Sequence, residues 1–137
     1  MEPDSANATH LVVLLSLSVL LLLFHILLQA SFATRELGRT WNAGPRDKGE
    51  QPISARAGRA ARASKNYQET YPAFIGLLLG LAFIGDPTGL GIGGAWFWLI
   101  SRIVYVPIYL AGIAYIRTLV WGLSIVGLLI MMAALLA

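Results

Sequence analysis

The sequence predicts an all-α integral membrane protein, a bundle of four transmembrane helices in a single domain over residues 1–137. Hydrophobic residues make up 57% of the chain and charged residues only 12%, which leaves too little polar surface to cover a water-soluble fold. Apolar segments of about 20 residues, the length of one membrane crossing, recur along the chain. Eight of the ten Lys and Arg residues lie between Thr34 and Asn66, so the net charge of +3 indicates membrane topology and not a nucleic-acid surface.

The first predicted span covers residues 11–33, a run of 23 residues without a formal charge. It follows an acidic start with Glu2 and Asp4 instead of a basic one, which favours a retained membrane helix over a cleaved signal peptide. The next segment, residues 34–65, is basic and contains several Gly and Pro residues, so it is predicted to be a loop. We expect the Ala- and Arg-rich end of this loop to become helical again.

The second span is predicted over residues 66–84 and is expected to end at a turn around Asp86 and Pro87. We expect this turn, outside the membrane, to include four glycines: Gly89, Gly91, Gly93 and Gly94.

The third and fourth spans are predicted over residues 95–115 and 117–137. Four crossings place both termini on the same side of the membrane. The positive-inside rule then places the loop 34–65 in the cytoplasm and the termini in the periplasm or lumen, in a bacterial inner membrane or one of endoplasmic-reticulum type.

The absence of Cys excludes disulfides, thiolate metal sites and a cysteine nucleophile. His10 and His25 are isolated from other ligand-type residues, so no metal site is expected. Any thiol chemistry must therefore come from a ligand.

A stripe of polar side chains is predicted where the basic loop enters the second span. Helical spacing places four residues on one face: Arg59, Arg62, Asn66 and Glu69. A carboxylate inside a membrane needs a partner or loses its charge, so Glu69 is a candidate functional residue. The same pattern also fits an interfacial anchor, in which the arginines reach lipid phosphates and Glu69 pairs with Arg62 or Lys65.

A second stripe follows the third span, with Arg102, Tyr105 and Tyr109 on one face. An arginine in the middle of a membrane helix is energetically costly and is a functional candidate, and we expect Glu69 to be its partner. Pro107 removes one backbone donor and favours a local opening beside the tyrosines. The two stripes predict a shared intramembrane cavity, unless Glu69 and Arg102 form only a structural pair.

Arg117 begins the fourth span with Thr118 beside it, near the cytoplasmic mouth of this cavity. An ordinary interfacial arginine is the alternative interpretation. The predicted cavity holds more positive charge than Glu69 can neutralise, which favours an anionic ligand. The positive charge comes from Arg59, Arg62, Arg102 and Arg117.

The segment RAARASKNYQETYPAF at residues 59–74, the segment RIVYVPIY at 102–109, and Arg117 resemble the MAPEG family. These are membrane-associated proteins of eicosanoid and glutathione metabolism. The resemblance implies a four-helix bundle that forms a homotrimer, with glutathione bound between neighbouring subunits. Gly58 departs from the family pattern, in which many members have Glu before the first arginine.

The resemblance also implies roles for individual residues. The residues implied to hold glutathione are Arg62, Asn66, Glu69, Tyr105 and Tyr109, with Arg59 and Arg102 in the same cavity. Arg35, at the end of the first span, is implied as a further ligand of glutathione. Arg117 is implied to stabilise the thiolate, and we expect the reacting sulfur to lie near Arg117 and Tyr109.

The expected function is that of a membrane glutathione transferase or peroxidase, with glutathione as co-substrate and a lipophilic electrophile arriving from the bilayer. Glutathione would supply the thiol that the protein lacks, and a nearby arginine would raise the fraction ionised. The expected partners are copies of the same chain, membrane lipids and the electrophile, with no nucleic acid. A non-catalytic lipid-binding protein of the same fold is one alternative. A small transporter or structural membrane protein is the other, although the chain shows no repeat and no ion-coupling carboxylate beyond Glu69.

Overall fold

Four long helices lie side by side in the computed structural model, which describes residues 5–52 and 54–137. The helices are α1 (Ser5–Leu37), the short α2 (Arg39–Ala43), α3 (Ala55–Ile84), α4 (Leu90–Leu110) and α5 (Ala114–Leu136). Glu2 and Asp4 lie outside the described residues. No strand occurs in the described part of the chain, so the predicted all-helical class is confirmed, with α2 as an additional short helix.

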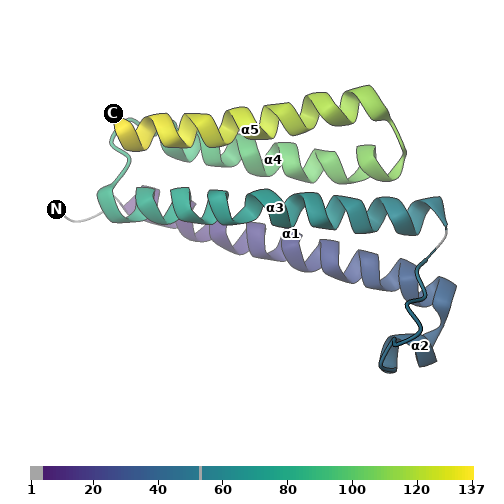
Figure 1. Ribbon diagram of the computed structural model, residues 1–137. Helices are drawn as coiled ribbons and strands as arrows, with labels where there is room; N and C mark the ends of the chain where they lie inside the picture. The colour runs from purple at the N-terminus through teal and green to yellow at the C-terminus, as the bar shows by residue number, and fades with distance from the viewer. Residues whose placement is uncertain (1–4, 53) are drawn as a thin grey trace.

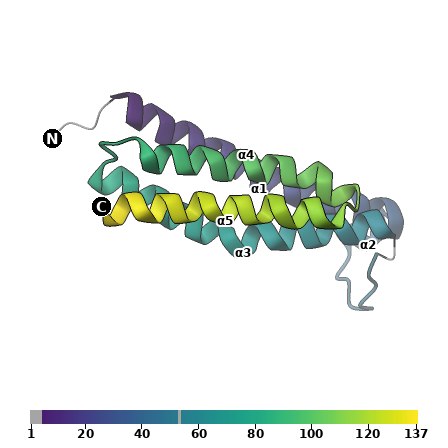
Figure 2. The same ribbon diagram turned by 90° about the horizontal axis from the view of Figure 1, so that it is seen from above.

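The four long helices form two pairs, α1 with α3 and α4 with α5 (Figure 1). The start of α1 and the end of α5 lie at one end of the bundle. The helix α2 and the turn between α4 and α5 lie at the opposite end, as both views show (Figures 1 and 2). We call this second end the loop end.

In the part of the chain that the structure describes, three helices are long and apolar enough to cross a membrane: α1, α4 and α5. They support the assignment to integral membrane proteins. The helix α3 is also long, at 30 residues, but its first half carries charged and amide side chains that lower its hydropathy. The span at residues 66–84 therefore stays a prediction.

The expected turn at Asp86 and Pro87 is present and includes Gly89, but the expectation that Gly91, Gly93 and Gly94 belong to it is wrong, because α4 begins at Leu90 and contains them. Two of these helical glycines allow close packing of α4 against its neighbours. A side chain on Gly91 would collide with Leu81 of α3, and one on Gly94 would lie 2.9 Å from the carbonyl oxygen of Gly127 in α5.

The first turn of α4 is capped by Asp86, which is buried. Its carboxylate accepts hydrogen bonds from the amide nitrogens of Gly91 at 3.1 Å and Ile92 at 2.8 Å. These amides have no partner inside the helix, and a negative charge is favourable at a helix N-terminus. The cap fixes where α4 starts and hence which of its residues face the bundle.

Aromatic side chains fill the space between α1, α3 and α4. Phe74 stacks on Trp98 with ring centroids 3.9 Å apart, and Tyr67 stacks on the buried His25 at 5.0 Å. The Tyr67 hydroxyl donates to the carbonyl oxygen of Ser18 at 2.6 Å. This packing fixes the rotation of α3, so that its polar stripe points away from α1.

The contact between α4 and α5 leads to a prediction for Gly127. A Cβ atom at this position would lie 2.8 Å from the backbone nitrogen of Trp98 and 2.9 Å from the carbonyl oxygen of Gly94, and backbone atoms cannot move aside as a side chain can. We expect Gly127→Ala to destabilise the protein by about 1–3 kcal/mol, measured by thermal unfolding in detergent.

Gly122 of the same helix is the matched control, because a Cβ atom there meets nothing within 4 Å. We expect Gly122→Ala to be neutral or to stabilise α5 by up to about 1 kcal/mol through helix propensity. Equal unfolding temperatures for the two variants would show that α4 and α5 do not pack through Gly127.

Candidate functional site

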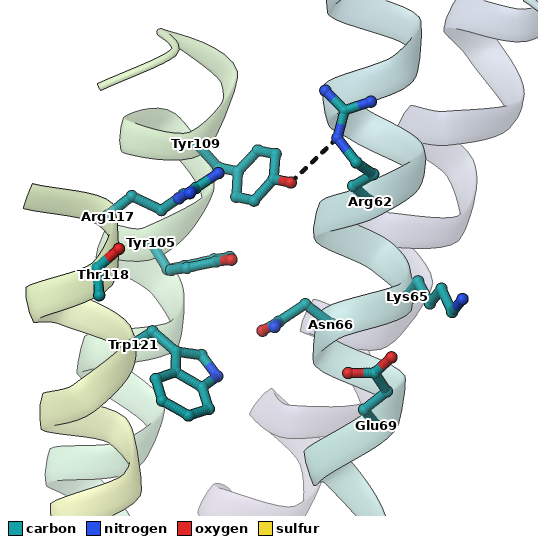
Figure 3. A pocket seen from close by; sticks show the side chains of 9 residues that line it. All are labelled: Arg62, Lys65, Asn66, Glu69, Tyr105, Tyr109, Arg117, Thr118 and Trp121. Atoms are coloured by element: carbon teal, nitrogen blue, oxygen red, sulfur yellow. Dashed lines mark hydrogen bonds between the residues drawn. The ribbon is translucent and has the colours of Figure 1, made fainter. Parts of the chain in front are cut away.

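A polar cavity of about 440 Å³ lies among α3, α4 and α5, towards the loop end of the bundle (Figure 3). It is lined by Arg62, Lys65, Asn66 and Glu69 of α3, Tyr105 and Tyr109 of α4, and Arg117, Thr118 and Trp121 of α5. Six of the predicted site residues are therefore brought together: Arg62, Asn66, Glu69, Tyr105, Tyr109 and Arg117.

The wall formed by α3 follows directly from helical geometry. Its four lining residues are separated by three, one and three positions, which places them on one face. The opposite face is held against the bundle by buried Ala60, Ala63 and Tyr67. Arg62 and Glu69 are exposed in the single chain, so both can reach a ligand.

Tyr109 links the three helices around the cavity. Its hydroxyl oxygen accepts a hydrogen bond from Nε of Arg62 at 3.2 Å, the dashed line in Figure 3. The guanidinium carbon of Arg117 lies 5.0 Å from the centre of the same ring, within the range of a cation–π interaction. The ring of Tyr105 lies next, 5.4 Å away between centroids. One aromatic side chain thus holds two arginines at the cavity.

Arg102 is not in the lining of the cavity, and the expected pair between Arg102 and Glu69 is wrong. Arg102 is fully buried, and its Nη1 donates to Oδ1 of Asn66 at 2.8 Å. No ion pair joins Arg102 to Glu69 within the residues that the structure describes. The physical reason is that Arg102 lies on the core side of α3 beside Tyr105, whereas Glu69 points to the exposed side.

Arg59 and Arg35 are also outside the lining in this single chain. The Nη1 of Arg59 donates to the carbonyl oxygen of Leu110 at 3.2 Å, at the C-terminus of α4, where helix carbonyls lack intrahelical partners. Arg59 therefore stabilises the turn between α4 and α5. Arg35 is exposed at the end of α1, a helix that contributes no residue to the lining.

Comparison with protein families identifies the chain. A family model described as the MAPEG family matches residues 13–137, nearly the whole chain and every residue that lines the cavity. The chain belongs to the MAPEG family. No curated protein and no solved structure matches it. With its three apolar helices, this MAPEG chain is an integral membrane protein of a family that includes glutathione transferases and related enzymes.

Two residues that line the MAPEG cavity, Lys65 and Trp121, were not predicted as site residues. Lys65 lies three positions after Arg62, and Trp121 lies four positions after Arg117. Both spacings place the residue next to a predicted one on the same helical face. Helical periodicity could therefore have indicated them.

The charge of this MAPEG cavity favours an anion. Arg62, Lys65 and Arg117 line it with only one carboxylate, that of Glu69, among the described residues. No cluster of three potential metal ligands occurs in the described part of the chain. The cavity can thus offer cations to carboxylates, one carboxylate to an amine, and aromatic hydroxyls as further hydrogen-bonding groups.

Proposed function

We propose that this protein is a membrane glutathione transferase, with peroxidase activity as a variant of the same chemistry. It activates the glutathione thiol for attack on a lipophilic electrophile. The observation that carries the proposal is the cavity at the loop end, in which three cations, one carboxylate and two tyrosines surround about 440 Å³ of space.

Glutathione has the chemical groups that this lining would recognise. Its two carboxylates suit arginine and lysine side chains, and its ammonium group suits Glu69. The cavity volume lies within the range of about 300–1,000 Å³ that small-molecule sites occupy. A thiol peptide also supplies the sulfur nucleophile that a chain without Cys cannot provide.

Catalysis would depend on the ionisation of the bound thiol. A free thiol has a pKa of about 8.5, so only a few per cent is thiolate at neutral pH. A guanidinium close to the sulfur stabilises the thiolate, and Arg117 is the arginine that stacks on Tyr109 at the cavity. The thiolate sulfur then forms a bond to an electrophilic carbon, and the leaving group departs with the bonding electrons. The thiol proton goes to solvent.

The proposal includes a homotrimer with the site between neighbouring subunits, as the MAPEG family implies. The exposed side of α3 supports it, because Gln68 and Glu69 are exposed within the predicted span at residues 66–84 and would face hydrocarbon in an isolated chain. A second copy of the chain would cover these groups. It would also be the source of Arg35, which does not line the cavity of its own chain.

The proposed topology places the loop end, with residues 34–65, in the cytoplasm and the termini in the periplasm or lumen. The membrane is a bacterial inner membrane or one of endoplasmic-reticulum type. The cavity then lies near the cytoplasmic surface, where a water-soluble thiol peptide can enter. A lipophilic electrophile reaches it from the bilayer between the helices.

Conjugation of glutathione to a generic aryl halide by the purified protein in detergent tests this function. A transferase produces the thioether in proportion to protein concentration, above the rate without protein. A lipid-binding protein of the same fold would bind acyl chains without turnover. A transporter would instead move labelled glutathione into proteoliposomes, and either of these outcomes without conjugation contradicts the proposal.

A further inference from the structure

Arg102 does not line the cavity, but it donates a hydrogen bond to Asn66, which does. Its guanidinium carbon lies 4.4 Å from the ring centre of Tyr105 and 5.5 Å from that of Tyr67, and the residue is fully buried. Its Nη1 donates to Oδ1 of Asn66, whereas its Nε and Nη2 have no hydrogen-bond partner among residues 5–52 and 54–137. The guanidinium is therefore oriented by two aromatic rings and one amide.

We propose that Arg102 is a positioning residue that fixes the orientation of the Asn66 amide. An arginine has only donors, whereas an asparagine amide has one acceptor oxygen and one donor nitrogen. The Asn66 oxygen must therefore face Arg102. The amide nitrogen, with its two donors, is then the group that Asn66 offers to the cavity it lines.

This orientation determines which part of a ligand can lie against α3. An unrestrained asparagine can turn either end of its amide to a ligand, but Asn66 presents its NH2 group to the cavity while Arg102 holds its oxygen. Glu69, one turn further along α3, can only accept when ionised. The ligand group at Asn66 must then be an acceptor oxygen, from a carboxylate or a peptide carbonyl, and the group at Glu69 must be an N–H donor.

The inference rests on the proposed function and makes it more specific. In this inference Arg102 affects glutathione binding by orienting Asn66, and Arg102 itself does not contact the ligand. Direct contact and indirect positioning predict different results for the same pair of substitutions.

The first test compares Asn66→Asp with Asn66→Ala by calorimetric titration with glutathione. Aspartate keeps Arg102 paired, so the fold is retained, but it turns an oxygen towards the ligand oxygen. We expect Asn66→Ala to weaken binding about tenfold and Asn66→Asp to weaken it by about a further tenfold. Binding by Asn66→Asp at wild-type affinity, or tighter than by Asn66→Ala, overturns the inference.

The second test is a double-mutant cycle with Arg102→Met, with circular dichroism and thermal unfolding to confirm folding. If Arg102 acts only through Asn66, adding Arg102→Met to Asn66→Ala leaves the glutathione affinity unchanged. If the losses of glutathione affinity caused by the two single substitutions multiply in the double variant, Arg102 contacts glutathione directly, and the inference is overturned. Arg102→Lys keeps a donor towards Asn66, and we expect it to retain affinity within about threefold. Absence of binding by the folded wild-type protein contradicts the proposed function, whereas tight binding by Asn66→Asp contradicts this inference alone.

Discussion

Replacement of Arg117 by alanine is expected to lower the rate of glutathione conjugation about a hundredfold, with a much smaller change in glutathione affinity. Arg117 lines the cavity from α5 and lies over the ring of Tyr109, where the sulfur is expected to react. Without its charge, the pKa of the bound thiol returns towards the free value of about 8.5, and each unit lowers the thiolate fraction about tenfold. Steady-state kinetics with an aryl halide measures the loss.

The ultraviolet absorbance of the bound thiolate, followed against pH, provides a direct readout of this role. The wild-type protein is expected to form thiolate at lower pH than free glutathione, and Arg117→Ala is expected to remove most of this shift. Arg56→Ala is the matched control, because Arg56 is an exposed arginine of α3 outside the lining. An unchanged thiolate titration in Arg117→Ala would mean that Arg117 does not stabilise the sulfur.

Glu69→Gln is expected to weaken glutathione binding by about ten- to a hundredfold. Glu69 provides the one carboxylate in the lining, and it is the partner proposed for the ammonium group of the ligand. Glutamine keeps the size and an acceptor oxygen but loses the charge, and hydrogen bonds to charged groups are worth about 1.5–3 kcal/mol. Calorimetric titration measures the change in Kd.

A ligand without the amine separates this role from a general effect on the cavity. Desamino-glutathione cannot pair with Glu69, so it should bind the wild-type protein and Glu69→Gln with similar affinity. Arg56→Ala again provides the control on the protein side, because Arg56 is an exposed residue of α3 outside the lining. Equal losses for both ligands would contradict an ammonium site at Glu69.

Much of the site could be predicted from the sequence, because helical periodicity determines which side chains share a face of a helix. Arg62, Asn66 and Glu69 of the α3 stripe are found in one cavity with the tyrosines of α4, as their spacings indicated, whereas Arg59 of the same stripe is outside the lining. Arg117 joins them because it lies in the first turn of α5, directly after the α4–α5 turn. The same residues indicated the resemblance to the MAPEG family, and the match to the family model confirms it.

The rotation of one helix against another could not be read from the sequence. Arg102 has the spacing of a cavity residue, but α4 is turned so that its guanidinium lies behind Asn66. Periodicity also could not distinguish a glycine turn from a helix that uses Gly91 and Gly94 for close contacts, because both patterns are rich in glycine. Arg35 is a separate case, because its proposed role depends on a neighbouring subunit.

Calorimetric titration of the purified protein with glutathione, beside an analogue in which a methyl group replaces the thiol, tests the central claim most directly. The predicted result is saturable binding of both peptides, with proton release for glutathione alone, because only its thiol ionises in the cavity. The opposite result is a folded protein that gives no saturable heat with either peptide. It would contradict the claim that these cations, Glu69 and the tyrosines form a site for an anionic thiol peptide.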